Sequence, residues 1–249
     1  MKENYLFNHP DITLYQSDKL YKASLDSVLL SHFVRVKKND KYVLDIGTGN
    51  GPIPLLLKKM YDLDITGVEI QKETYLLAKR NAEVNELDIK FINGDINKLY
   101  KTMENEKYDI ITCNPPYFLY QNEELINDKT EYALSRHAIT LTTEDIMVVS
   151  KKLLKNKGSI VLVQRPEYLI NIIETMKKYN IEPKRIKFVY PKKGSNSNIV
   201  LIEGVKNGRP SLKVEDALYV YEKGEYSNEL YEYLKWGYYE VNSRTRKPR

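Results

Sequence analysis

Residues 41–57 read KYVLDIGTGNGPIPLLL, and this stretch decides the fold. A short apolar run through Ile46 is typical of a buried strand. Gly47, Gly49 and Gly51 follow at alternate positions, and glycine lets a backbone turn tightly and approach a ligand without an intervening side chain. Pro52 then stands where a helix tolerates proline, in its first turn, ahead of a second apolar run. The stretch therefore predicts a strand, a glycine-rich turn with room for a ligand, and a helix.

Strand-like and helix-like patterns alternate along most of the chain. The expected strands cover 41–46, 64–70, 88–94, 108–114, 158–164, 185–190 and 198–206, and the expected helices lie within 20–34, 53–60, 71–85, 142–154 and 167–180. Such alternation predicts an α/β fold with a doubly wound, mostly parallel sheet, here of seven strands. The last two strands are joined by a short loop and are expected to form a C-terminal antiparallel hairpin on one edge. We expect one domain, 40–249, behind a short N-terminal extension, 1–39, with Ser24 or Asp26 capping the first helix.

Composition narrows the class of protein. With 249 residues and 42% hydrophobic side chains, the chain is able to form a core. No stretch approaches the roughly 20 apolar residues that span a bilayer, and the first residues do not resemble a signal peptide. The single cysteine, Cys113, excludes an internal disulfide and a cysteine-based zinc site. We expect no metal, no membrane contact and a cytoplasmic location, and Cys113 is expected to be the last buried residue of its strand.

Positive charge is concentrated in the second half of the chain. Residues 150–213 hold 15 Lys and Arg against 4 Asp and Glu, although the whole chain carries only +5, and the last six residues, 244–249, add four cations. A block this basic would attract a polyanion such as a nucleic acid, with Lys192 and Lys193 among the contacts. The alternative is a set of solvated surface faces in a lysine-rich chain.

Carboxylates mark the ends of the first three predicted strands. Asp45 opens the glycine turn; Glu69 stands near the end of the second strand, where a carboxylate can accept both hydroxyls of a ribose. Asp95 follows the third strand and would accept a hydrogen bond from an adenine amino group. Each acid alone could be an ordinary loop charge, but acids at successive strand ends together indicate a nucleoside site. The glycine spacing, G-x-G-x-G, differs from the G-x-G-x-x-G of dinucleotide binding.

Asn114, Pro115, Pro116 and Tyr117 directly follow the fourth strand, at the edge where open α/β sheets bind ligands. An aromatic amine is a poor nucleophile because its lone pair is delocalised. The Asn114 side-chain oxygen and the Pro115 carbonyl can each accept a hydrogen bond from one N–H of such an amine. These two hydrogen bonds favour a tetrahedral nitrogen. The prolines stiffen the turn, and Tyr117 offers a face for base stacking. The alternative is a plain strand-ending turn, since Asn-Pro often opens turns.

Together these motifs resemble the class I S-adenosylmethionine-dependent methyltransferases, over about residues 40–205. The acid that opens the glycine motif supports the loop in that family. Pro52 and Pro54 remove backbone N–H donors that a phosphate would need, which favours S-adenosylmethionine over a nicotinamide cofactor. The Asn-Pro-Pro-Tyr motif resembles the signature of enzymes that methylate amino groups of adenine, guanine or a protein glutamine.

A fuller resemblance rests on LDSVLL (25–30), LDIGTGNGPIPLLL (44–57), NPPYF (114–118) and SRHAITLTTEDI (135–146). These stretches are similar to those of the bacterial tRNA1(Val) adenine-37 methyltransferases. The resemblance implies an adenine flipped out of the anticodon loop into the pocket, with tRNA, through its anticodon stem-loop, as partner. The segment with Arg136 and His137 would cover the pocket, against an equally plain alternative of a solvent-facing pair. Asp26 would help close over the methionine end of the cofactor, with the extension 1–39 packing over the cofactor site.

The expected site residues follow from the motifs and the resemblance together. Catalysis is assigned to Asn114, Pro115 and Tyr117, cofactor binding to Asp26, Asp45, Gly47, Thr48, Gly49, Gly51, Glu69, Asp95 and Asn114, and substrate binding to Pro116, Tyr117, Phe118, Arg136, Lys192 and Lys193.

Three rival functions remain open on the sequence. A release-factor glutamine methyltransferase would hold its amide similarly, but usually carries a helical N-terminal domain for which 40 residues leave too little room. A DNA adenine methyltransferase would need a sequence-reading insertion, and none is evident. A non-catalytic RNA-binding protein on the same fold would need to have lost the cofactor or amine contacts, which are intact. The oligomeric state stays open.

Overall fold

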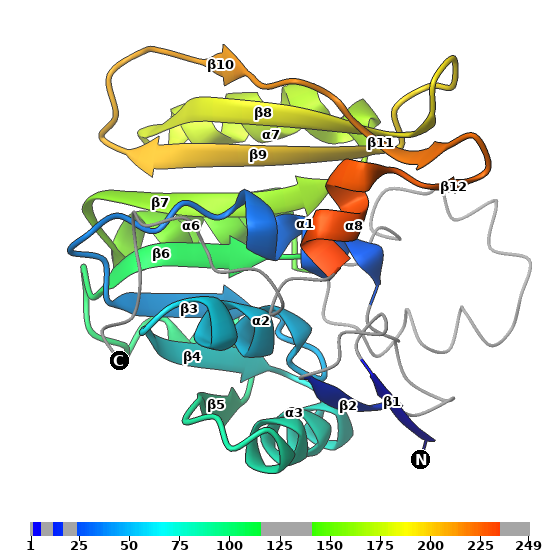
Figure 1. Cartoon of the computed structure of the whole chain (residues 1–249). Helices are drawn as coiled ribbons and strands as arrows, with labels where there is room; N and C mark the ends of the chain where they lie inside the picture. The colour runs from blue at the N-terminus through cyan, green and yellow to red at the C-terminus, as the bar shows by residue number, and fades with distance from the viewer. Residues whose placement is uncertain (1, 6–11, 17–23, 116–140, 235–249) are drawn as a thin grey trace, which may run out of the picture.

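The computed structural model describes residues 2–5, 12–16, 24–115 and 141–234. Its central feature is a ten-stranded sheet in the order β12-β11-β8-β9-β7-β6-β3-β4-β5, with β10 also paired to β8 (Figure 1). The strands are β3 (Tyr42–Ile46), β4 (Asp64–Glu69), β5 (Lys90–Asn93), β6 (Tyr108–Cys113), β7 (Leu154–Gln164), β8 (Ile181–Lys192), β9 (Ile199–Lys206), β10 (Lys213–Val214), β11 (Leu218–Glu222) and β12 (Glu225–Tyr226).

The first five of these strands, β3 to β7, run parallel. β9 lies antiparallel to both β7 and β8, so β8 again points the same way as the parallel strands. The carboxyl ends of β3, β4, β6, β7 and β8 therefore share one edge of the sheet, which we name the carboxyl edge. All seven expected strands are present, including the antiparallel hairpin formed by β8 and β9, and the α/β doubly wound fold class is confirmed.

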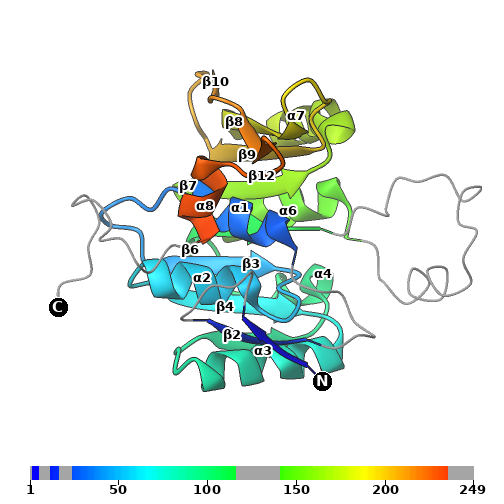
Figure 2. The same cartoon turned by 45° about the vertical axis from the view of Figure 1, so that its right-hand side comes forward.

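Helices cover both faces of this sheet (Figure 2). One face carries α1 (Leu25–Phe33), α2 (Pro52–Met60), α3 (Lys72–Val84) and α8 (Asn228–Leu234); the other carries α4 (Ile96–Leu99), α6 (Thr143–Leu153) and α7 (Leu169–Lys178), which continues the short 3-10 turn η4 (Pro166–Tyr168). Because both faces are covered, all six residues of β6 are buried, as are the last seven of β7. Such strands read as continuous apolar runs, which is how the sequence showed them.

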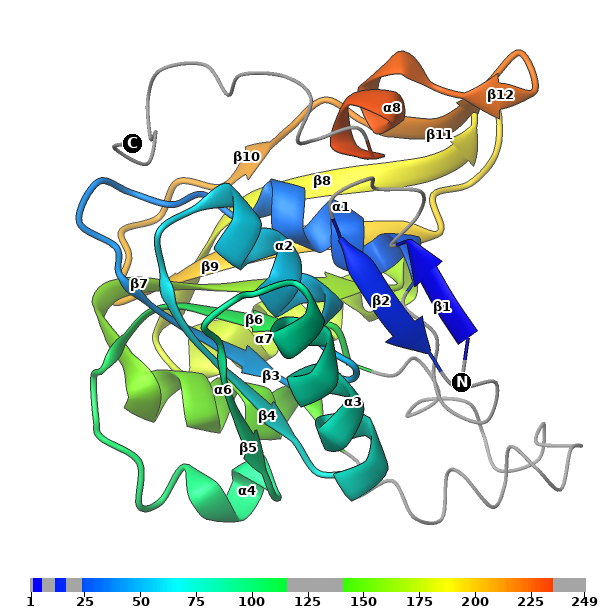
Figure 3. The ribbon, with the colours of Figure 1, turned by 60° about the horizontal axis from the view of Figure 1, so that its bottom comes forward.

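Several short elements extend the seven expected strands. β10 and β11 pair with the outer edge of β8, at its start and at its end respectively, and so satisfy backbone groups that an open edge would expose. At the other end of the chain, β1 (Lys2–Tyr5) and β2 (Thr13–Gln16) form a separate antiparallel hairpin, of which β2 lies beside α3 (Figure 3). The sequence patterns predicted none of these strands.

Candidate active site

The glycine turn lies at the carboxyl edge, between β3 and α2. All three glycines have positive φ, +67° at Gly47, +58° at Gly49 and +91° at Gly51, a region that side chains rarely adopt. A Cβ on Gly47 or Gly49 would meet no described heavy atom within 4 Å. Gly51 begins α2, and Pro52 occupies the first helical turn as expected. The loop therefore leaves open space in front of its backbone, as a ligand-binding turn requires.

Asp45 is fully buried beneath this turn. Its Oδ1 accepts a hydrogen bond from the Thr112 hydroxyl at 2.6 Å, and burial raises its pKa to about 7. Neither Asp45 Oδ2 nor the Thr48 hydroxyl, which is also buried, has a hydrogen-bond partner of good geometry among the described residues. The Thr48 hydroxyl still lowers the pKa of Asp45, so the two side chains lie next to each other and form one buried polar pair under the turn.

Glu69 faces the glycine turn from the end of β4. Its carboxylate accepts the backbone N–H of Gly49 at 2.9 Å and that of Gln71 at 2.8 Å. Burial raises the pKa of Glu69, and these two N–H groups partly oppose the rise. Each oxygen accepts one of these bonds and retains further acceptor capacity, as a pair of ribose hydroxyls would need. The predicted convergence of the glycine turn and Glu69 is present.

Asp95 lies one strand further along the same edge, after β5. Its Oδ1 caps α4 by accepting the Asn97 N–H at 2.9 Å, and its Oδ2 lies 3.9 Å from Lys98 Nζ. The carboxylate thus has a structural role in addition to the adenine contact that the sequence suggested, which stays a prediction.

Asparagine side chains join the N-terminal hairpin to the glycine turn. Asn81 Oδ1 accepts the Tyr15 N–H at 2.7 Å, while Asn81 Nδ2 donates to the Asn50 carbonyl at 2.9 Å. Asn50 Nδ2 donates to the Tyr15 carbonyl at 3.2 Å, and Asn85 bonds both backbone groups of Thr13. Strand β2 therefore abuts the wall of the candidate cofactor site.

Asn114 and Pro115 follow β6 at the same edge. The Asn114 amide nitrogen donates to the Ser27 hydroxyl at 3.3 Å, and Ser27 is buried in α1. The amide oxygen of Asn114 accepts no hydrogen bond from the described part of the chain. In this orientation the amide oxygen of Asn114 remains available as a hydrogen-bond acceptor. Pro115 is buried, whereas Pro116, Tyr117, Phe118, Arg136 and His137 lie outside the described residues.

The helix that carries Ser27 is itself anchored at its far end. The His32 ring stacks on Tyr233 of α8 at 4.5 Å between centroids, and Nε2 lies 2.9 Å from the Tyr233 carbonyl oxygen. The buried Arg185 donates to the Phe33 carbonyl at 2.6 Å and pairs with Glu203 and Glu215. Asp26 lies in the first turn of α1 next to Ser27; Ser24 stands at the N-cap without a side-chain capping bond.

Much of the basic block pairs with acids of the same chain. The side chains of Lys187 and Lys206 are only 11% and 9% exposed and pair with Glu229 and Glu106, while Lys155 pairs with Asp109. Lys192 and Lys193, by contrast, are exposed on the β8–β9 turn at the carboxyl edge. The net charge of residues 150–213 therefore overstates the positive charge that this region exposes. Lys192 and Lys193, which were predicted as contacts, are among the lysines that stay exposed.

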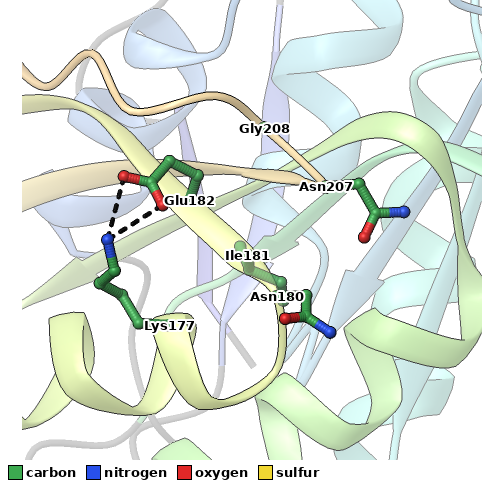
Figure 4. A pocket seen from close by; sticks show the side chains of 6 residues that line it. All are labelled: Lys177, Asn180, Ile181, Glu182, Asn207 and Gly208. Carbon is green, nitrogen blue, oxygen red and sulfur yellow. Dashed lines mark hydrogen bonds and ion pairs between the residues drawn. The ribbon is translucent and has the colours of Figure 1, made fainter.

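A hollow of about 280 Å³ lies elsewhere, where β8 begins and β9 ends (Figure 4). It is lined by Lys177, Asn180, Ile181, Glu182, Asn207 and Gly208, and the Lys177–Glu182 ion pair, at 3.1 Å, crosses it. This is the amino edge of the sheet, opposite the glycine turn, so the hollow is unrelated to the candidate site.

Two absences concern the described residues only. They hold no cluster of three His, Cys, Asp or Glu side chains able to bind a metal ion. Within the same ranges, none of the helices is both long and apolar enough to cross a membrane. Cys113 is a free, fully buried thiol at the end of β6, as expected, and burial raises its pKa well above the ordinary value, which disfavours a nucleophilic role.

Sequence reasoning missed Ser27, Asn50 and Asn81 as site residues. Ser27 could have been predicted, because it stands in the LDSVLL stretch on which the family resemblance partly rests. Asn50 and Asn81 gave no signal, since asparagine in a turn or on a helix is ordinary and their partner strand is 35 or 66 residues away.

Known proteins match both the sequence and the fold. The tRNA1(Val) (adenine(37)-N6)-methyltransferase of Parabacteroides distasonis is 29% identical over 80% of this chain and 83% of its own length. The release factor glutamine methyltransferase of Streptococcus pneumoniae is 31% identical, over 65% of this chain and 59% of its own length. Among solved structures, a predicted O-methyltransferase from Agrobacterium tumefaciens superposes with a TM-score of 0.68 at 18% identity, covering 84% of this chain and 95% of that one.

The model of the methyltransferase small domain matches residues 9–188, which is more than half of the sequence. The match includes the glycine turn, the three strand-end acids Asp45, Glu69 and Asp95, and Asn114. This match confirms the resemblance to methyltransferases that the motifs indicated. This chain belongs to the methyltransferase small domain family.

Proposed function

We propose that this protein transfers a methyl group from S-adenosylmethionine to the exocyclic N6 amine of an adenine in tRNA, adenine 37 beside the anticodon of tRNA-Val. One observation carries the chemistry: Asn114 stands beside the glycine turn with its amide nitrogen bonded to Ser27 and its amide oxygen left to accept. The relatives that extend over most of the chain support the choice of tRNA.

The described residues fit the cofactor. Glu69 would bind the ribose hydroxyls, Asp45 and Thr48 form a buried polar pair beneath the glycine turn, and Gly47 and Gly49 leave the space that a nucleoside needs. Asp95 would bind the adenine amino group. When bound, S-adenosylmethionine supplies a methyl group activated by a sulfonium. We propose further that residues 1–39 form an extension over this site, with β2 against its wall, ahead of the methyltransferase domain of 40–249.

The protein's part in the reaction is positioning. Asn114 Oδ1 and the Pro115 carbonyl would each accept a hydrogen bond from one N–H of the adenine amine. These two hydrogen bonds would turn the nitrogen lone pair toward the methyl group and favour the tetrahedral nitrogen of the transition state. No strong base is needed before transfer, because the neutral amine attacks through its own lone pair. The N-methylated nitrogen is then positively charged and acidic, and it would lose its extra proton to water. Tyr117 and Phe118 would stack on the flipped base, and Arg136, Lys192 and Lys193 would contact the RNA.

The anticodon stem-loop is the part of tRNA that we propose as partner, since bases of a loop are already partly unstacked and cost less to flip. A cytoplasmic location follows from this proposed substrate.

The decisive experiment incubates the protein with methyl-labelled S-adenosylmethionine and unmodified total tRNA, then digests the RNA and identifies the labelled nucleoside. Label in N6-methyladenosine is the expected result. The rival is glutamine methylation, which the release-factor relative favours, and a parallel incubation that contains release factor tests it. Label that enters release factor but no RNA would establish that rival instead.

A variant of Asn114 tests the mechanism. We expect Asn114→Ala to lower kcat about 10²- to 10³-fold, as loss of one transition-state hydrogen bond does elsewhere. Cofactor affinity should fall much less, because the cofactor contact predicted for Asn114 is one of several. Single-turnover methylation and calorimetric titration of S-adenosylmethionine measure the two quantities. Near-normal turnover would show that Asn114 does not hold the amine.

A further inference from the structure

A row of tyrosine side chains crosses the end of the sheet at the carboxyl edge. Tyr190 of β8 lies 5.5 Å from Tyr219 of β11 between ring centroids, Tyr221 stacks on Tyr226 at 5.2 Å, and Tyr226 meets Tyr231 edge-on at 5.9 Å. We name these five residues the tyrosine row. Tyr221, Tyr226 and Tyr231 are 44%, 36% and 36% exposed.

The alternation of side chains along β11 and its register with β8 bring these tyrosines together. In β11, Leu218 and Val220 are buried in the core, so the alternate residues Tyr219 and Tyr221 point to the other face. Register pairs Tyr219 with Tyr190 across the parallel strands. Large aromatic rings are normally buried, and a line of neighbouring exposed rings is typical of a contact surface rather than of solvent-facing strand ends.

Positive charge lies directly beside the row. Lys192 is the register partner of Tyr221, and Lys193 follows it on a tight turn closed by the Ser195 N–H to the Lys192 carbonyl and by Gly194 at φ +86°. Glu222 and Glu225 flank the β11–β12 turn and are exposed, as is Lys223 between them, so that turn carries charges of both signs. The arrangement therefore offers ring faces to bases and the lysine turn to phosphates.

We propose that the tyrosine row stacks unpaired bases of RNA, flanking the base that is methylated; this inference rests on the proposed function. Four strand spacings separate β6 from β11, or roughly 19 Å, so the row would contact neighbouring nucleotides and not the reacting adenine. Aromatic stacking tolerates any base and is the usual way in which proteins bind single-stranded RNA.

The test compares full-length variants in binding to a tRNA1(Val) transcript and to a short unstructured oligoribonucleotide. Replacing Tyr221 and Tyr226 together by Ala is expected to weaken both complexes about tenfold or more, whereas replacing both by Phe keeps the rings and the affinity. Tyr179→Ala, at the amino edge, is the matched control and should bind normally. S-adenosylmethionine affinity should not change in any variant.

Each result bears on one idea. If wild-type protein methylates tRNA but the Ala pair binds both RNAs as tightly as the control variant, the tyrosine row is not an RNA surface and the proposed function stands. If wild-type protein methylates no tRNA but binds the oligoribonucleotide through the row, the function fails and this inference survives. Wild-type binding to neither RNA, or a change in self-association alone, would overturn it.

Discussion

The contact between Asn114 and Ser27 links a side chain at the carboxyl edge of the sheet to helix α1. An amide presents a donor at one end and an acceptor at the other, and a half-turn exchanges them. The Ser27 hydroxyl engages the nitrogen end, and α1 holds Ser27 in place. Ser27 is in this sense a positioning residue, since its effect on the amine would pass through Asn114.

Replacing Ser27 by Ala should therefore lower kcat without weakening cofactor binding. A hydrogen bond of ordinary strength corresponds to a loss of about three- to tenfold. Ser31→Ala is the matched control, because Ser31 is buried in the same helix and its hydroxyl donates to the Ser27 carbonyl at 2.7 Å. Equal losses of kcat in both variants would mean that Ser27 only stabilises α1.

Asp45 makes the stability of the ligand-free protein depend on pH. Burial raises its pKa from 3.8 to about 7, so between these values the folded state retains a proton that the unfolded state has lost. Its contribution is complete below about pH 4 and is lost as the pH rises toward 7, at up to about 1.4 kcal/mol per pH unit.

Urea denaturation of wild type and Asp45→Asn at several pH values isolates this group. The free energy of unfolding of wild type should fall relative to that of the variant from about pH 5 to pH 7, and the difference should level off above about pH 8. Parallel curves would show that Asp45 is charged throughout in the folded protein.

At the scale of elements, the sequence predicted best where an element carries its own signals. The helix expected at 142–154 is α6, and its Thr and Asp start is a complete capping box: Thr142 Oγ1 accepts the Asp145 N–H at 3.1 Å, and Asp145 Oδ2 accepts the Thr142 N–H at 2.9 Å. Local sequence patterns likewise predicted the glycine turn and the buried strands.

The capping box should contribute measurably to stability. Thr142→Ala is expected to cost about 1 kcal/mol, which lowers Tm by about 2–4 °C in a chain of this size. Thr175→Ala is the control: that hydroxyl bonds the Asn171 carbonyl within α7 and caps nothing. A thermal melt of both variants decides, and equal Tm values would contradict the role of the cap.

Elements formed by distant pairing were not predictable. β10 has two residues and β12 two, too few for an alternating pattern, and each exists because a partner strand offers free backbone groups. β8 begins at Ile181 and includes Pro183, which reads as a strand breaker, yet a register shift in its pairing with β9 accommodates the proline. The same limit applied to the candidate site. The motifs predicted site residues within them, but a residue such as Asn81, whose place at the site depends on a contact distant in sequence, was not predictable.

At the scale of the whole molecule, charge counted along the chain differs from charge on the surface. Acids from outside the basic block, among them Glu106, Asp109 and Glu229, neutralise lysines within it. Net charge over a window therefore predicted the class of partner but could not identify the residues that reach it, because ion pairing is decided by the fold.

Lys192 and Lys193 should account for part of the salt dependence of tRNA binding. Changing both to Gln is expected to reduce the slope of log Kd against log salt by about 1 to 2, whereas Lys177→Gln with Lys178→Gln, the same change of charge at the amino edge, should leave it nearly unchanged. Fluorescence anisotropy over a salt series measures the slopes, and equal reductions would mean that only net charge matters.

The contact between α1 and α8 joins the first and the last helix that the structure describes. Helix α1, which carries Ser27, also packs on β7 and β9, and its His32 meets Tyr233. A ribosome releases residues in order, at roughly 5–20 per second, so the first helix must wait about ten seconds or more for its last neighbour. The support of α1 is thus complete only after α8 has been synthesised, and nascent chains that stop before Asn228 lack the contact that anchors the helix bonded to Asn114.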